Sequence, residues 1–238
     1  MKIKYFIYVI GVLQLIFLTL LTIDVTTNED AIGRAIVGMV WGLVVLWVFI
    51  GGMIQLRVRE SFREWILSIA IGWRIKFVLI AIVAALIEEA ITVLMTNLAP
   101  VFGVEIGEAY ITASANYLDV VLFHSVVVFV PMFIAWAWLL GRYDFNRYQV
   151  FLLFGLTGMA GEIISFGGAG ILNMGLWVYV YGLMVYLAVY TLPERDNLKP
   201  VRWYHFPLAI IVPILAAIPI AIVIMFVHPV SIHFAEIG

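Results

Sequence analysis

Seven long apolar stretches, separated by short polar segments, dominate the chain. They cover residues 5–23, 35–56, 77–98, 116–140, 149–166, 172–192 and 206–227. As helices rising 1.5 Å per residue, stretches of this length cross about 30 Å of hydrocarbon. The pattern therefore predicts an all-α bundle of seven transmembrane helices, which forms a single integral membrane domain over residues 1–238.

The positions of lysine and arginine support this division. With seven spans, twelve of the 13 basic residues fall on the side of the N-terminus, and only Arg34 falls on the other. Loops rich in lysine and arginine remain in the cytoplasm during insertion. We therefore expect a multi-pass protein of the cell membrane with a cytoplasmic N-terminus and an outside C-terminus.

Residues 62–76 form a separate apolar segment next to the third span. The stretch from Trp65 to Trp73 is too short to cross a bilayer, and it is bracketed by Arg63, Arg74 and Lys76. Short apolar segments flanked by basic residues lie in the membrane interface. The pattern predicts a short interfacial helix on the cytoplasmic side.

The composition agrees with a membrane protein. Hydrophobic residues make up 65% of the chain and charged residues 12%, and the mean hydropathy is +1.14. The net charge of −2 excludes a basic surface for nucleic acid, and the absence of cysteine excludes disulfides and thiolate metal sites. The expected partners are the lipid bilayer and a membrane-resident substrate or small solute.

Two adjacent glutamates in the third span are the strongest sign of function. Glu88 and Glu89 lie in the middle of an apolar run, where a charge costs about 2.5–3.5 kcal/mol and so needs a partner, a proton or a function. Together with Ala81, Ala85, Thr92 and Thr96 they recur at helical spacing. Such a small and polar stripe is expected to face other helices or a cavity rather than lipid.

The next spans carry further polar residues in the middle or outer half of the membrane. Asn116, Asp119 and His124 lie in the fourth span, Glu162 lies near the outer end of the fifth, and Asn173 begins the sixth. We predict one polar cavity that opens outward. Its supporting residues would be Thr92, Asn116, Asp119 and Asn173.

Two kinds of hydrolytic chemistry fit these residue types. Glutamate and histidine side chains bind Zn²⁺ or another divalent metal that activates water, and the candidate ligands are Glu89, His124 and Glu162. Alternatively, a buried glutamate acts as a general base on water without a metal. The H-E-x-x-H motif of zinc proteases and the P-loop motif are both absent, so the cofactor stays undetermined.

The pair Glu88-Glu89, followed by an intramembrane His124, resembles the glutamate-type intramembrane proteases that process prenylated CAAX proteins. That family has E-E-x-x-x-R, F-x-x-x-H and a later H-x-x-x-N. Here Val93 stands at the arginine position, Val120 stands four residues before the histidine, and the third motif is absent. The resemblance keeps hydrolysis among the reaction classes and assigns no family.

Three functions remain open at this stage. The first is a membrane-embedded hydrolase that acts on a lipid-linked or membrane-inserted substrate, with Glu88, Glu89 and His124 as catalytic residues and Glu162 in support. The second is a proton- or cation-coupled transporter that uses Glu88 and Glu89. The third is a non-catalytic subunit of a larger membrane complex, in which the polar groups serve helix packing.

Overall fold

A computed structural model describes residues 3–166, 168–229 and 234, with residues 165, 166 and 168–170 described by their backbone alone. Within these ranges the chain is helical and has no β-strand. The helices are α1 (Ile3–Thr27), α2 (Ala31–Leu43), η1 (Val44–Gly51), α3 (Gly52–Ser68), α4 (Trp73–Asn97), η2 (Ala99–Phe102), α5 (Tyr117–Asp119), η3 (Val120–His124), α6 (Val126–Leu140), α7 (Arg147–Phe166), η4 (Gly168–Asn173), α8 (Met174–Tyr190) and α9 (His205–Val227). The prediction of an all-α chain is confirmed for the described residues.

Several of these helices are suited to a membrane. In the described part of the chain, five are long and apolar enough to cross a bilayer, and the bent pair of segments Tyr117–His124 and Val126–Leu140 would make a sixth. α7 forms at the fifth predicted span but is not among them. Seven spans and the orientation of the termini therefore stay predictions.

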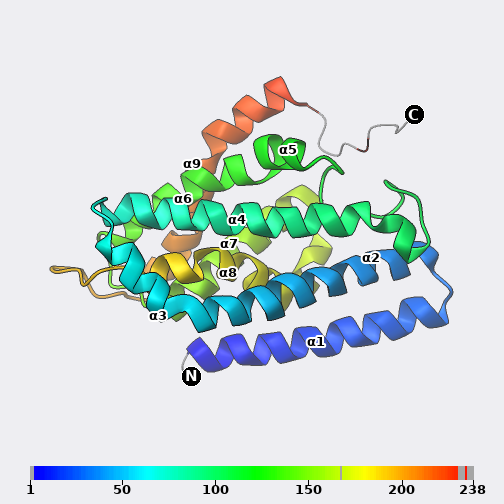
Figure 1. Cartoon of the computed structure of the whole chain (residues 1–238), viewed down its shortest axis with the longest axis horizontal. Helices are drawn as coiled ribbons and strands as arrows, with labels where there is room; N and C mark the ends of the chain where they lie inside the picture. The colour runs from blue at the N-terminus through cyan, green and yellow to red at the C-terminus, as the bar shows by residue number, and fades with distance from the viewer. Residues whose placement is uncertain (1–2, 167, 230–233, 235–238) are drawn as a thin grey trace.

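α1 and α9 lie at the edge of the bundle. In their most apolar windows only 17% and 11% of the residues, respectively, are buried inside the protein. Figure 1 shows α1, α2 and α4 as long rods along the long axis, while α9 rises across the top of the view. The exposed sides of α1 and α9 are rich in isoleucine, leucine and valine, which suits contact with lipid.

The core is built around α8, which packs against α7, α4, α1 and α3. Glycines allow the closest contacts. A Cβ atom on Gly155 of α7 would lie 2.5 Å from Cα of Val178 in α8, and one on Gly175 would lie 2.5 Å from the Ile10 carbonyl oxygen of α1. Small residues bring helix backbones together in this way in membrane bundles.

α2, η1 and α3 form one continuous helical segment from Ala31 to Ser68, with a π-helical stretch in its middle. Gly38 and Gly42 on α2 face the neighbouring helical layer. A Cβ atom on Gly38 would meet the ring of Phe102, and one on Gly42 would lie 2.0 Å from Sδ of Met95 in α4. This pair of glycines therefore serves contacts within the chain.

The prediction of a separate interfacial helix at 62–76 is wrong, because these residues belong to the end of α3, a turn and the start of α4. α3 continues without a break to Ser68, the chain turns at residues 69–72, and α4 already begins at Trp73. The polar segment 57–64 lacks glycine and proline, so the second span runs on as a helix beyond its apolar part. The break falls where Ile69 leaves the helical region (ψ 129°) just before Gly72 (ψ 137°).

The fourth predicted span is bent by 45° between η3 and α6. Ser125 lies at the bend with φ −135° and ψ −79°, and its backbone N–H donates to the Val120 carbonyl at 2.9 Å. This bond spans five residues, one more than in an α-helix, and insertions of this kind often mark functional sites. The bend places His124 and Ser125 at the junction of two helical segments.

Candidate functional site

Two buried glutamates and a third, partly buried one lie together inside the bundle. Glu88 and Glu89 come from α4 and are 4% and 7% exposed. Glu162 comes from α7 and lies close enough to both to interact electrostatically with them. Within the described residues, no lysine, arginine or histidine forms an ion pair with any of the three. We call Glu88, Glu89 and Glu162 the carboxylate cluster.

Hydroxyl groups hold two members of this cluster. The Thr92 hydroxyl donates to a carboxylate oxygen of Glu89 at 3.1 Å, and the Ser125 side chain lies near the same carboxyl group. The Tyr181 hydroxyl of α8 donates to the carboxylate of Glu162. The cluster is thus supported by three helices and by the bend before α6.

Tyr181 reaches Glu162 because a glycine makes room for its ring. A Cβ atom on Gly158 of α7 would lie 2.1 Å from Cδ2 of Tyr181. The Tyr181 ring also contacts Phe129 of α6, with ring centroids 5.7 Å apart, and Trp177 of α8 at 5.9 Å. These aromatic rings fix the tyrosine hydroxyl beside the carboxylate cluster.

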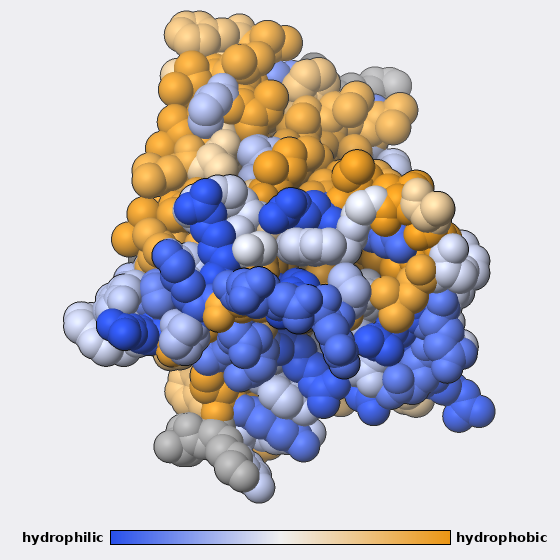
Figure 2. All heavy atoms as spheres, turned by 90° about the vertical axis from the view of Figure 1, so that its left-hand side faces the viewer, coloured by the Kyte–Doolittle hydropathy of each residue, from blue (hydrophilic) through white to orange (hydrophobic). Residues whose placement is uncertain are grey.

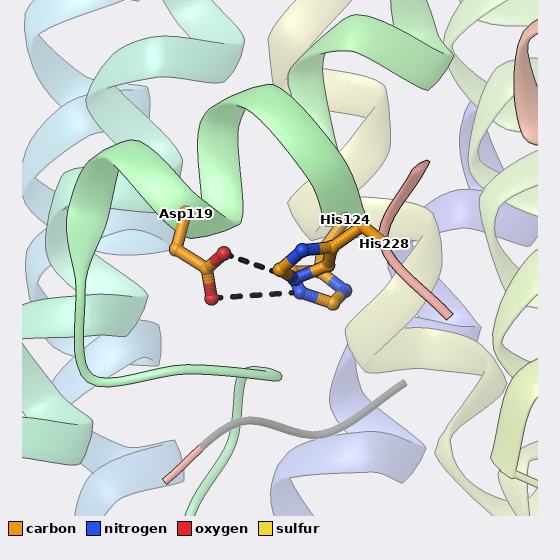
Figure 3. A group of neighbouring side chains, drawn as sticks. All are labelled: Asp119, His124 and His228. Carbon is orange, nitrogen blue, oxygen red and sulfur yellow. Dashed lines mark ion pairs between the residues drawn. The ribbon is translucent and has the colours of Figure 1, made fainter. Parts of the chain in front are cut away.

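A second polar group lies at the edge of the bundle, where three helix ends meet (Figure 3). Asp119 ends α5, His124 ends η3, and His228 follows the last residue of α9. Nε2 of His124 is 3.6 Å from one carboxylate oxygen of Asp119, and Nε2 of His228 is 3.1 Å from the other. We call Asp119, His124 and His228 the histidine cluster.

The histidine cluster has the donor set and the spacing of a metal site. Its three ligand atoms all lie within 4.8 Å of one another. Ligands in a tetrahedral zinc site lie about 3.3 Å apart, since each is about 2.0–2.1 Å from the metal. The two histidine nitrogens lie 3.6 and 3.1 Å from different oxygens of Asp119, which is close to this spacing. Two imidazoles and one carboxylate form one of the known ligand sets of hydrolytic zinc enzymes, which leave a position for water.

Aromatic contacts fix the orientation of the rings. Phe123 stacks on His228 with centroids 4.4 Å apart, and the rings of His124 and His228 meet edge to face at 5.1 Å. The three side chains of the cluster are between 11% and 20% exposed. They are therefore positioned by packing, and the atoms that would ligate a metal, Oδ2 of Asp119 and Nε2 of both histidines, are buried among them.

The two clusters adjoin through consecutive residues of the bend. His124 belongs to the histidine cluster, and the next residue, Ser125, lies beside Glu89 of the carboxylate cluster. The predicted residues are thus divided between two clusters on either side of the bend. Among the described residues, His124 shares a potential metal site with Asp119 and His228, and not with Glu89 or Glu162.

Two predicted supporting residues have local structural contacts. The Asn116 side chain accepts hydrogen bonds from the backbone N–H groups of Leu118 and Asp119, at 3.0 and 3.3 Å, and so caps α5. The Asn173 side chain accepts from Nε2 of Gln14 at 3.1 Å, which joins the start of α8 to α1. Asn116 orders the turn that carries Asp119, whereas Asn173 stabilises helix packing.

Sequence reasoning missed His228 and Tyr181. His228 directly follows the last predicted span, on the side where the fourth span begins, so the predicted topology already placed it at the same surface as Asp119. Tyr181 lies in the middle of an apolar span that carries other aromatic residues, and nothing in its spacing distinguishes it from them.

Compared with protein-family models, with curated proteins and with solved structures, the chain gives no match.

Proposed function

We propose that this protein is a membrane-embedded, metal-dependent hydrolase that acts on a lipid-linked or membrane-inserted substrate. The observation that carries the proposal is the histidine cluster, in which Asp119, His124 and His228 present three ligand atoms at the spacing of a zinc site. The site belongs to a bundle of apolar helices, so a substrate embedded in the bilayer would approach it more readily than a soluble one.

The two clusters would have different roles in hydrolysis, metal binding in one and proton transfer in the other. Asp119, His124 and His228 would hold the divalent metal, which acidifies water and polarises a carbonyl or phosphoryl group. Glu89 is the carboxylate nearest the bend through its contact with Ser125, so we assign it the role of general base. Glu88 and Glu162, with Tyr181, keep the surroundings of Glu89 polar inside an apolar bundle.

Metal binding and hydrolysis by matched variants test this proposal. The purified protein should bind Zn²⁺ and cleave one of two probes in bilayers, a fluorogenic phospholipid ester or a fluorogenic transmembrane peptide, and a chelator should stop the cleavage. Glu89→Gln should retain Zn²⁺ but lose cleavage, whereas His124→Ala should lose both. Cleavage that survives both the chelator and His124→Ala would contradict the proposal.

The carboxylate cluster favours a second candidate, a proton- or cation-coupled transporter. Two buried carboxyl groups and a partly buried third, with no basic partner among the described residues, are typical of ion pathways inside membrane proteins. In liposomes, a transporter would show substrate-driven proton or cation flux that Glu88→Gln abolishes, with no chelator-sensitive cleavage. If Glu88→Gln and His124→Ala change only the melting temperature, the remaining explanation is a packing role in a non-catalytic subunit.

A further inference from the structure

The basic end of the bundle, where α3 ends and α4 begins, contains two adjoining pockets. One has a volume of about 420 Å³ and is mainly polar, and the other has a volume of about 320 Å³ and is mainly apolar. Leu192 and Pro193, just after α8, line both of them. Figure 2 views this end of the molecule and shows hydrophilic side chains gathered over it, next to extensive apolar surface.

The polar pocket carries more positive than negative charge. Arg63, Arg147 and Arg195 line it, together with Glu60 and Asp144. The carboxylate of Glu60 already has two partners, Arg59 outside the pocket lining and Tyr190 within it. Nε of Arg59 lies 3.7 Å from its carboxylate, and the Tyr190 hydroxyl donates to the same oxygen.

Two of the three arginines contact neutral groups, and Arg195 also interacts electrostatically with Asp144 at longer range. The guanidinium of Arg147 lies over the ring of Tyr190 at 5.3 Å, and Arg195 donates to the backbone carbonyl of Leu140. In the described part of the chain, no carboxylate lies within 4.0 Å of the Arg63, Arg147 or Arg195 guanidinium. Guanidinium groups without a carboxylate partner are well suited to a phosphate, which accepts from them through two oxygens at once.

The second pocket offers apolar surface directly beside these charges. It lies at the turn between α3 and α4 and includes Leu67, Ile69, Ala70 and Ile71. Lys76, which also lines it, donates to the Ile66 carbonyl at 2.6 Å. A charged pocket that opens onto an apolar one matches a ligand with a phosphate head and a hydrocarbon chain.

We propose that this double pocket binds an anionic phospholipid, with its phosphate among Arg63, Arg147 and Arg195 and the start of an acyl chain against the α3–α4 turn. A phospholipid is favoured over other phosphate compounds because the two pockets share a wall and lie where the apolar surface of the bundle meets its basic end. Basic clusters next to membrane spans bind anionic headgroups in this position. The site is independent of the proposed hydrolytic centre.

Lipid binding to the full chain in a neutral detergent tests this proposal. Native mass spectrometry should show retention of phosphatidylglycerol in preference to phosphatidylcholine. Arg63→Gln should weaken phosphatidylglycerol binding about fivefold, the effect of one basic residue near an anionic headgroup. Arg57→Gln is the matched control, because Arg57 is exposed on the same helix and lies outside both pockets, and it should leave the affinity unchanged.

Two further comparisons separate the lipid from a soluble phosphate compound. Glycerol phosphate, which has no acyl chain, should bind much more weakly than phosphatidylglycerol. Ala70→Trp, which fills the apolar pocket, should weaken phosphatidylglycerol binding without affecting glycerol phosphate. Equal binding of the lipid and glycerol phosphate would overturn the assignment of a lipid as the ligand. Equal effects of Arg63→Gln and Arg57→Gln would overturn the assignment of this pocket as the binding site.

Discussion

The carboxylate cluster is assembled from long helices at the centre of the bundle, whereas the histidine cluster is assembled from helix ends at its edge. Glu88, Glu89 and Glu162 lie in the interiors of α4 and α7, whose regular spacing brings them against α8. Asp119, His124 and His228 each lie at or directly beyond the last residue of a helical segment. The first cluster follows from helical periodicity, and the second depends on how distant segments meet.

This difference has a chemical consequence. The glutamates of α4 are at most 7% exposed, so water and ions reach them only through the protein. The side chains of the histidine cluster are 11% to 20% exposed and present three ligand atoms together. The histidine cluster is therefore the better place for a metal, because its donor set suits one, and the carboxylate cluster is the better place for a proton.

Loss of one metal ligand should produce the largest effect. His228→Ala should lower the affinity for Zn²⁺ by more than about 100-fold, because substitutions of outer-shell partners alone cost 10–100-fold. The measurement is equilibrium dialysis followed by metal analysis. His205→Ala is the matched control, since His205 lies at the other end of α9 and accepts only a backbone N–H, from Arg202 at 2.8 Å. An equal loss of Zn²⁺ affinity in both variants would contradict the assignment of His228 as a metal ligand.

Crowding the contact between α7 and Tyr181 should have the next largest effect. Gly158→Ala places a Cβ atom 2.1 Å from the Tyr181 ring and should lower the free energy of unfolding by about 1–3 kcal/mol. Gly161→Ala, one turn further along α7, meets nothing within 4 Å and should be neutral or slightly stabilising. Denaturation of the two variants in mixed micelles checks this, and similar stabilities would contradict the described packing.

Removal of one central carboxyl should have a smaller and opposite effect. Glu88→Gln keeps the side-chain shape and replaces an ionisable group that is buried next to two other carboxyl groups, so it should raise the free energy of unfolding by about 1 kcal/mol. Glu64→Gln, on the exposed part of α3, should leave stability unchanged. Strong destabilisation by Glu88→Gln would mean that the carboxylate cluster makes a contact that only a charged group provides.

The smallest effect should come from the hydroxyl that holds Glu89. Thr92→Val removes the 3.1 Å hydrogen bond and should cost about 0.6 kcal/mol, the mean for such bonds inside membrane proteins. Thermal unfolding followed by circular dichroism is the measurement. Thr22→Val is the comparison, because it removes a hydroxyl far from both clusters. That hydroxyl accepts from Nε1 of Trp41 and donates to the Leu18 carbonyl.

The parts of the molecule that sequence could predict are those governed by helical spacing. The stripe from Ala81 to Thr96 is buried along one side of α4, as its three- to four-residue spacing indicated. The bend at Ser125 was not predicted, because no glycine or proline marks it and Pro131 lies six residues further on inside α6. The extension of α3 and the interaction of His228 with Asp119 likewise depend on contacts that no local pattern contains.

X-ray absorption spectroscopy at the zinc edge, on the Zn²⁺-loaded protein, would show directly whether the histidine cluster holds the metal. The spectrum should show two imidazole nitrogens and one carboxylate oxygen at about 2.0–2.2 Å, it should be unchanged in Glu88→Gln, and His124→Ala should retain no bound zinc. A spectrum with oxygen ligands alone, altered by Glu88→Gln and indifferent to His124→Ala, would place the metal in the carboxylate cluster and contradict the account.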